Sequence, residues 1–303
     1  MGKTLLVILG PTAIGKTDLS IKLAQHYQTE IISSDSRQFY SELNIGVARP
    51  SPTELFAIPH HFIGFLPITE EFSAGMFARR ALEKLEELFE THDYVVCSGG
   101  SMLYIDALIN GLDELPSDKE TRKKIIGYYQ QYGLEFIQKQ IQELDPEYSE
   151  IADLSNPHRV IRALEVCLVS GEKYSALRKD VKQERVFKTI KIGLNTSREK
   201  LYNRINRRVD RMLEEGLLEE AKSLFAQRSL NSLNTVGYKE LFSFFEGTIN
   251  REEAIDQIKQ HSRNYAKRQL TWWKRDEEIT WFEISDSETL KTTVLEHLST
   301  LIR

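Results

Sequence analysis

A segment near the N-terminus has the residue pattern of a phosphate-binding loop. It reads Gly10-Pro11-Thr12-Ala13-Ile14-Gly15-Lys16-Thr17, a glycine, four residues and then Gly-Lys-Thr. In such a loop, backbone N–H groups at a helix N-terminus surround an anion, the lysine supplies a cation and the threonine hydroxyl can bind Mg²⁺. The segment therefore predicts a di- or triphosphate site typical of ATP-binding and other nucleotide-binding proteins. The alternative is a tight glycine turn with a solvated lysine.

The strand that supplies a second Mg²⁺ ligand in ordinary ATPases lacks the expected acid. Residues 94–97 are apolar and run into Ser98-Gly99-Gly100-Ser101. Proteins that transfer a phosphoryl group from ATP place a carboxylate at this strand end. The sequence thus argues against an ordinary ATPase and leaves the loop free for a different diphosphate.

An acidic residue does follow the second predicted strand, which covers 30–33. Asp35 comes two residues after that strand. Loops at the carboxyl ends of parallel strands line the ligand crevice, so Asp35 is expected near the phosphate site. Spacing alone fits equally well with an aspartate that only caps its own loop.

Strand and helix patterns alternate along the chain and predict a doubly wound parallel α/β sheet of the P-loop NTPase type. Strands are expected at 3–9, 30–33, 93–97, 186–194 and 279–284, with helices at 16–27, at 73–91 and from 102. From 118 to about 179 only helical periodicity is found. We therefore expect a P-loop core with C-terminal helices, formed by 1–116 and 186–303, and a helical insertion domain over 117–185.

Length and composition fit a folded chain of about two domains. The 303 residues are 41% hydrophobic and 28% charged, which excludes general disorder. No apolar run approaches the roughly 18 residues of a spanning helix, and the N-terminus has no signal-peptide pattern, so we expect a cytoplasmic protein without membrane contact. Cys97 and Cys167 cannot form a disulfide framework or zinc site. The net charge is −5, yet 198–211 and 261–275 are basic and could meet a polyanion.

Several motifs, taken together, resemble those of the bacterial tRNA dimethylallyltransferase family. Besides the loop at 10–17, they are Ser34-Asp35-Ser36-Arg37-Gln38-Phe39-Tyr40, Asn44-Ile45-Gly46-Val47-Ala48-Arg49-Pro50, Pro59-His60-His61, Gly99-Gly100-Ser101-Met102-Leu103-Tyr104, Asn156-Pro157-His158-Arg159-Val160, Thr235-Val236-Gly237-Tyr238-Lys239 and Lys267-Arg268-Gln269-Leu270-Thr271-Trp272. The resemblance covers about residues 3–283. It implies transfer of a dimethylallyl group from dimethylallyl diphosphate to the N6 amine of the adenosine just 3′ of the anticodon (position 37), in tRNAs that read codons beginning with U. It also implies Mg²⁺ as cofactor, the tRNA anticodon stem-loop as partner and a monomeric enzyme.

The same resemblance implies roles for individual residues. Asp35 would accept a proton from the adenine amine, Thr17 would bind Mg²⁺, and Arg208 would hold the leaving diphosphate, with the segment from Gly10 to Thr17 around it. Contacts to tRNA would come from Asp35, Ser36, Arg37, Gln38, Ser101, Lys123, His158, Arg159, Thr235, Gly237, Tyr238, Lys239, Lys267, Arg268, Gln269 and Trp272. The insertion would grip the anticodon stem-loop.

Three positions depart from the family pattern. Ser101 replaces the usual threonine but keeps the hydroxyl, Gly64 stands where an aspartate is common, and Asn234 is shorter than the usual polar side chain. Two other functions use a similar loop: a small-molecule or nucleoside kinase, and a non-catalytic RNA-binding protein switched by a nucleotide. The missing strand-end acid disfavours the first. A non-catalytic RNA-binding protein would give Asp35 and Ser101 no role.

Overall fold

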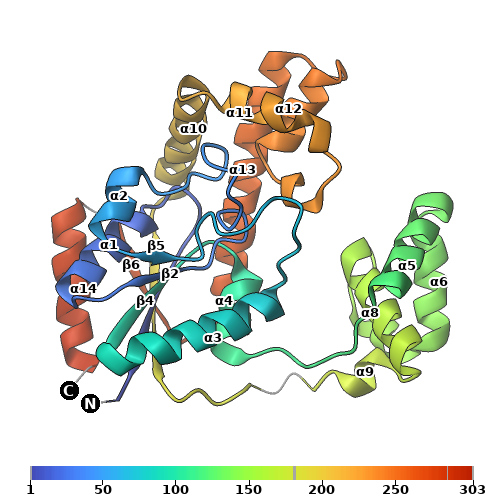
Figure 1. The fold of residues 1–303 in the computed structure, drawn as a ribbon, viewed down its shortest axis with the longest axis horizontal. Coiled ribbons are helices and arrows are strands. Elements are labelled where there is room, and N and C mark those ends of the chain that lie inside the picture. Colours follow the sequence, from blue (N-terminus) through green and yellow to red (C-terminus); the bar gives the residue numbers. More distant parts are fainter. Residues whose placement is uncertain (1, 180–181, 285, 302–303) are drawn as a thin grey trace. The chain divides into compact units, whose positions relative to one another are not determined.

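The sheet that carries the site is parallel throughout. The computed structural model describes residues 2–179, 182–284 and 286–301 (Figure 1). Within them, six strands lie in the order β3-β2-β4-β1-β5-β6. They are β1 (Thr4–Leu9), β2 (Ile31–Ser33), β3 (His60–His61), β4 (Tyr94–Ser98), β5 (Lys188–Asn195) and β6 (Ile279–Glu283). Every residue of β1 is buried, as expected for a strand covered on both faces. The predicted doubly wound α/β fold is confirmed.

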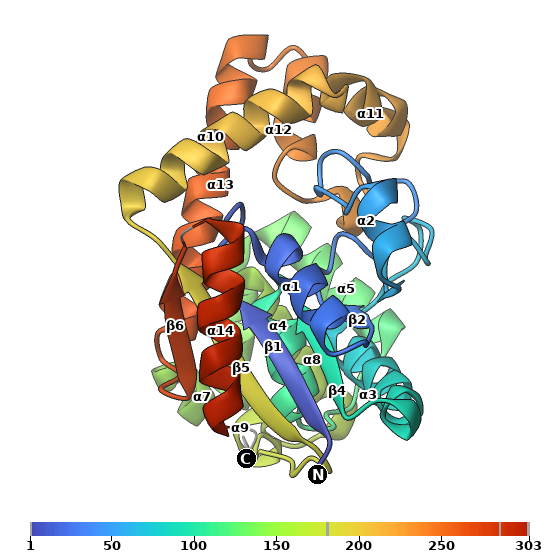
Figure 2. The ribbon, with the colours of Figure 1, turned by 90° about the vertical axis from the view of Figure 1, so that its left-hand side faces the viewer.

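Alternate side chains of β1 enter two apolar cores, one on each face of the sheet. Leu5 and Val7 join one core, whereas Leu6 and Ile8 join the other, because successive strand side chains point to opposite faces. Helices α3 (Ala74–Thr91) and α4 (Met102–Asn110) pack on the first core. Helices α1 (Lys16–His26) and α14 (Ser287–Leu301) pack on the second and lie next to each other (Figure 2).

Four further helices follow β5: α10 (Arg198–Glu214), α11 (Leu217–Leu224), α12 (Tyr238–Phe245) and α13 (Arg251–Trp273). Figure 2 shows α10, α11 and α12 beyond the carboxyl ends of the strands. Helix α10 begins at its cap Ser197, whose hydroxyl accepts from Lys200 N. It buries Leu201, Ile205 and Val209, which are four residues apart and so share one face. Arg204 and Arg208 consequently share a neighbouring face.

A separate compact unit, Asn110–Glu184, is helical in its described residues. It contains α5 (Lys119–Tyr132), α6 (Leu134–Leu144), α7 (Pro146–Ile151), α8 (Pro157–Ser170) and α9 (Tyr174–Leu177). The other unit holds Met1–Ile109 and Arg185–Arg303. The boundary lies at Asn110 rather than at the expected 117 because Arg162 of α8 donates to the carbonyls of Leu115 and Pro116, which ties this segment to the helices. The expected ends at 1 and 303, and residues 180–181 within the insertion, lie outside the described residues.

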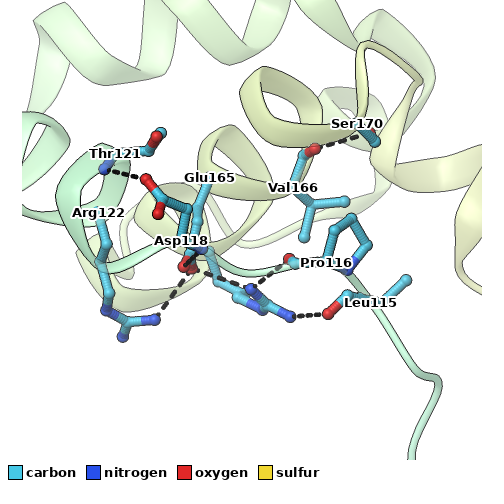
Figure 3. A network of polar contacts seen from close by, with 9 residues as sticks. Leu115, Pro116, Asp118, Thr121, Arg122, Glu165, Val166 and Ser170 are labelled. Carbon is cyan, nitrogen blue, oxygen red and sulfur yellow. Dashed lines mark hydrogen bonds and ion pairs between the residues drawn. The ribbon is translucent and has the colours of Figure 1, made fainter.

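A buried carboxylate joins the first helix of the insertion to α8 (Figure 3). Glu165 Oε2 accepts from Arg122 at 3.1 Å and from Arg162 at 2.9 Å, and Oε1 accepts from the backbone N–H of Asp118 at 3.2 Å. Its side chain is 2% exposed. Burying a carboxylate is unfavourable unless it is paired and hydrogen-bonded, and these three donors meet that requirement.

Some elements differ from the sequence-based expectation. The strand expected from 186 begins at Lys188, because Val186 is fully exposed and outside the ladder. The two-residue strand β3, the short helix α2 (Pro52–Ala57) and α14 were not expected. Strand β3 is too short to show periodicity, and α14 follows the last of the expected strands. No helix in the described parts of the chain is long and apolar enough to cross a membrane.

Candidate active site

The phosphate-binding loop lies between β1 and α1, as its sequence predicts. Gly10 and Gly15 have φ values of 143° and 105°, a region that favours glycine. A Cβ at Gly10 would lie 2.8 Å from the carbonyl oxygen of Leu194, so this position also needs glycine for space. Gly15 is the N-cap of α1 and makes no side-chain cap, which leaves the helix N-terminus available to an anion.

Lys16 is the cation of this loop. Its Nζ donates to the carbonyl oxygens of Gly10 at 2.9 Å and Pro11 at 3.0 Å. Burial lowers the pKa of Lys16 to about 7; nearby Asp35 opposes this effect and Arg208 adds to it. An anion on the loop would favour the charged ammonium, so anion binding and protonation of Lys16 are coupled.

Long-range hydrogen bonds hold the loop from two C-terminal helices. From α10, Arg208 donates to the Thr12 hydroxyl at 3.2 Å and Arg204 Nε donates to the carbonyl of Ala13 at 2.8 Å. From α13, Gln269 Oε1 accepts from the backbone N–H of Thr12 at 2.8 Å. Burial lowers the pKa of Arg208, while the charge of nearby Asp35 raises it. The loop is therefore preorganised by helices almost two hundred residues or more away in the sequence.

A cavity of about 280 Å³ opens over the loop. Its walls come from the carboxyl ends of β1, β2 and β4, where ligands bind in doubly wound sheets. The lining includes Thr12, Ala13, Ile14, Gly15, Lys16, Thr17, Ser33, Asp35, Gln38, Ala48, Arg49, Pro50, Glu54, His60, Ile63, Ser98, Arg204, Arg208, Tyr265 and Gln269. We call this cavity the loop cavity. The lining combines cations and hydroxyls with the apolar side chains of Ile63 and Pro50, which suits a small ligand with an anionic and an apolar end.

A second cavity, of about 340 Å³, shares part of this wall. Thr12, Ala13, Asp35, Arg208 and Tyr265 line both cavities. The remaining lining of the second cavity includes Ser36, Arg37, Gly46, Val47, Met212, Asn234, Thr235, Val236, Gly237, Lys239, Ser262 and Arg268. We call it the helix-side cavity, because α10, α12 and α13 contribute to it. Two ligands, one in each cavity, would meet at Asp35 and Arg208.

Asp35 fits both interpretations that its spacing left open. One carboxylate oxygen, Oδ1, accepts from the backbone N–H of Arg37 at 3.1 Å, so the side chain caps its own loop. The same residue also lines both cavities. Tyr265 closes this region from α13: its hydroxyl donates to the carbonyl of Gly100 at 2.9 Å, and burial raises its pKa, with the charge of Asp35 adding to the effect.

The other expected residues of the 34–40 motif support the loops around Asp35. Ser101 Oγ accepts from the backbone N–H of Ser36 at 2.8 Å. Gln38 Nε2 donates to the carbonyls of Val47 and Ala48 at 3.1 and 3.0 Å. The guanidinium of Arg37 donates to three backbone carbonyls, those of Asn231, Ser232 and Asn234. Gln38 lines the loop cavity, and Ser36 and Arg37 line the helix-side cavity. Ser101 supports Ser36 but is not among the residues that line either cavity.

The 235–239 motif divides between the cavity and the core. Thr235, Gly237 and Lys239 line the helix-side cavity. Tyr238 differs from the expectation of a tRNA contact: it is fully buried, and its hydroxyl donates to Glu220 at 2.6 Å. Helical geometry explains the split, because adjacent residues of α12 point in different directions.

The residues of the 267–272 motif on α13 also differ in burial: some are exposed and others are buried as supports of the site. Lys267 and Arg268 are exposed, and Arg268 lines the helix-side cavity. Gln269 is fully buried and holds both Thr12 and the carbonyl of Gly100. Trp272 is half-buried against the core, which fits packing better than stacking on RNA.

Three expected tRNA contacts, Lys123, His158 and Arg159, lie in the separate helical unit. All three are exposed, Lys123 on α5 and the other two in the first turn of α8. None of the three is among the residues that line the two cavities, which belong to the other unit.

The sequence pointed to no role for Arg204, Arg49 or Glu220, all of which contact or line the site. Tyr265, which its basic surroundings suggested as a residue that could stack on RNA, lines both cavities. A signal existed for Arg204, because it precedes Arg208 by four residues and so shares its helix face. Nothing local in the sequence marks Glu220, since its partners are backbone groups of a distant loop.

Comparisons with known proteins show what the chain is similar to. A family model described as IPP transferase matches residues 38–276. The tRNA dimethylallyltransferase 1 of Bacteroides fragilis is 51% identical over 281 residues, which is 92% of this chain and 93% of that protein. The tRNA dimethylallyltransferase of Christiangramia forsetii is 51% identical over 288 residues, 95% of each chain.

Solved structures give the same result. A tRNA delta(2)-isopentenylpyrophosphate transferase of Staphylococcus epidermidis has a TM-score of 0.72 and 33% identity, covering 98% of this chain and 99% of its own. A eukaryotic dimethylallyltransferase acting on tRNA has a TM-score of 0.80 and 27% identity, covering 98% of this chain and 77% of its own.

Proposed function

The chain belongs to the IPP transferase family and is a prenyl-transferring enzyme that acts on tRNA, and we propose which cavity of its site binds each substrate. The dimethylallyl group of dimethylallyl diphosphate moves to the exocyclic N6 amine of the adenosine just 3′ of the anticodon (position 37), in tRNAs that read codons beginning with U. The observation that carries this proposal is the position of Asp35 and Arg208 in the wall shared by the two cavities.

The loop cavity takes the donor. Its diphosphate lies on the N-terminus of α1 against Lys16, with Arg208 on the other side. These groups are in place before the reaction, which is what stabilisation of a departing diphosphate requires. The apolar side chains of Pro50 and Ile63 in the same cavity suit the dimethylallyl end.

Mg²⁺ fits the same place. Thr17 lines the loop cavity and follows the lysine of the loop. Its hydroxyl would be the protein ligand of the ion. When bound, the ion supplies positive charge to the leaving diphosphate.

The helix-side cavity takes the acceptor base. An adenine in a tRNA loop must leave its stack to reach Asp35, and the cavity lies between the basic helix α13 and the shared wall. As the new N6–C1 bond forms, the donor C1–O bond breaks. The amine proton passes to the carboxylate of Asp35, and diphosphate leaves with the bonding electron pair on its oxygen.

tRNA contacts extend beyond the cavities. Exposed Lys267 and Arg268 meet backbone phosphates, and the helical unit, with Lys123, His158 and Arg159 on its surface, binds the anticodon stem-loop. We also propose that the enzyme acts as a monomer. Action on tRNA supports a cytoplasmic location.

One assay tests the activity. Unmodified tRNA is incubated with dimethylallyl diphosphate in one reaction and with ATP alone in a parallel reaction. The products of each reaction are then identified by mass spectrometry. We expect an adenosine heavier by one dimethylallyl group in the first reaction only. Phosphorylated product in the second reaction, with no prenylated adenosine in the first, would replace the proposal with a kinase.

A further inference from the structure

Glu220, on α11, binds the loop formed by residues 44–50 through its carboxylate. Oε2 accepts from the backbone N–H groups of Asn44 at 3.2 Å and Ile45 at 2.8 Å, and Oε1 accepts from that of Gly46 at 2.9 Å. Consecutive N–H groups that converge in this way form an anion-binding nest. Hydrogen bonds to an ionised carboxylate are among the stronger ones in proteins.

The same carboxylate also binds the neighbouring helix. The Tyr238 hydroxyl donates to Glu220 Oε1 at 2.6 Å, and Tyr238 is fully buried. Its ring leaves no space above Gly46, where a Cβ would lie 2.6 Å from the ring. Glu220 therefore joins α11, α12 and the 44–50 loop at a single point.

This point lies behind the wall of both cavities. Gly46 and Val47 line the helix-side cavity, and Ala48 and Arg49 line the loop cavity. The carbonyls of Val47 and Ala48 accept from Gln38, as described above. The backbone N–H of Gln38 in turn donates to the carbonyl of Asp35 at 3.1 Å. A path of hydrogen bonds and connecting backbone thus runs from Glu220 through the 44–50 loop and Gln38 to Asp35, which lines both cavities.

We propose that Glu220 is a positioning residue for prenyl transfer, which fixes the 44–50 loop and thereby the placement of Asp35 and Gln38 against the acceptor base. The inference rests on the proposed function. Glu220 does not line either cavity, and its side-chain hydrogen bonds in the described residues go to the 44–50 loop and to Tyr238, not to the phosphate-binding loop. Its loss should consequently slow the transfer step and have little effect on the affinity for inorganic diphosphate.

The test uses the full chain with Glu220→Gln, which turns one acceptor oxygen into an amide donor facing other donors. The matched control is Glu219→Gln, the same chemical change on the exposed neighbouring residue. For each protein we would measure the single-turnover rate with dimethylallyl diphosphate and tRNA at saturation, and separately the affinity for inorganic diphosphate. We expect the rate of Glu220→Gln to fall on the order of 10-fold or more, since small displacements of reacting groups have large effects. Diphosphate affinity should change by less than about two-fold, because inorganic diphosphate binds the phosphate-binding loop, to which Glu220 makes no hydrogen bond in the described part of the chain.

A double-mutant cycle separates positioning from a general loss of packing. Glu220 and Gln38 hold the same loop, so Glu220→Gln combined with Gln38→Ala should lose less rate than the product of the single losses. An unchanged rate in Glu220→Gln, a parallel loss of diphosphate affinity, or fully multiplicative losses in the cycle would overturn the proposal.

Should Glu220→Gln not fold, Tyr238→Phe removes one of the four hydrogen bonds and keeps the ring. A rate reduced several-fold at unchanged diphosphate affinity supports the proposal, and an unchanged rate overturns it. Inactive wild-type protein in the same assay would instead contradict the proposed function.

Discussion

Arg208 donates a hydrogen bond to the Thr12 hydroxyl across 3.2 Å and so joins helix α10 to the phosphate-binding loop. The contact links residues 196 positions apart. Since Arg208 also lines both cavities, this one helix residue can support the loop at rest and stabilise charge on a departing diphosphate.

Replacing Arg208 with glutamine removes a buried charge from the wall shared by the cavities. We expect kcat to fall by about 10²-fold or more, the usual loss when a preorganised charge-stabilising donor is removed. Arg207→Gln is the matched control, because Arg207 is its exposed neighbour on α10. Steady-state kinetics with saturating tRNA measures both. Equal activity in the two variants would remove Arg208 from the transfer step.

Binding of inorganic diphosphate should take up a proton above neutral pH. The pKa of Lys16 is lowered to about 7 by burial, so above pH 7 the free side chain is mostly neutral, whereas an anion on the loop favours the charged form. Affinity should fall as the pH rises above about 7, by up to about 10-fold per pH unit from this residue. Calorimetry in buffers of different ionisation enthalpy measures the uptake.

Lys16→Arg provides the comparison for that experiment, because arginine stays charged throughout this range. Protons exchanged by diphosphate itself are common to both proteins and cancel. Identical uptake in wild type and Lys16→Arg would show that Lys16 does not titrate on binding.

tRNA binding should depend on salt through α13. Lys267 and Arg268 are exposed there, and each lost phosphate contact should reduce the slope of log affinity against log salt by about 0.7 for single-stranded RNA. Lys267→Gln with Arg268→Gln should therefore lower the slope by about twice that amount. Lys291→Gln, on α14, is the control of equal charge change per site. A slope equal to that of wild type would place the two residues outside the interface.

Glu165→Ala should destabilise the helical unit by about 1–3 kcal/mol. Its two arginine partners are 44% and 30% exposed and can return to water, so the loss is smaller than for a fully buried pair. Hydrogen exchange of α5 and α8 amides reports this unit. The tryptophans, Trp272, Trp273 and Trp281, all belong to the other unit and report its unfolding separately. Glu147→Ala, an exposed ion-pair residue, is the control. Unaltered amide protection in Glu165→Ala would contradict the stabilising role.

Residue spacing and periodicity predicted the parts of this molecule whose structure depends on neighbouring residues in the sequence. The loop at 10–17, the buried β1 and the helical insertion follow from spacing and periodicity, and the position of Asp35 at the edge of the sheet follows from the parallel topology. The fold class could be predicted because strands covered on both faces need continuous apolar runs.

Contacts between distant segments were not predictable in the same way. Glu220 binds backbone N–H groups 174 to 176 positions away, and such groups carry no residue identity. Tyr238 and Gln269 belong to motifs expected at the tRNA, yet the structure buries both side chains as supports of the site. Spacing indicates that a motif lies near a site, but the direction of each side chain depends on tertiary packing.

The single-turnover rate of Asp35→Asn tests the central claim most directly. Asparagine keeps the shape and one acceptor oxygen, including a partner for the backbone N–H of Arg37, but cannot take the proton from the adenine amine. We predict a loss on the order of 10²-fold or more, the usual contribution of a general base, with separately measured affinities for tRNA and dimethylallyl diphosphate unchanged. A near-normal rate of transfer in Asp35→Asn would contradict the account.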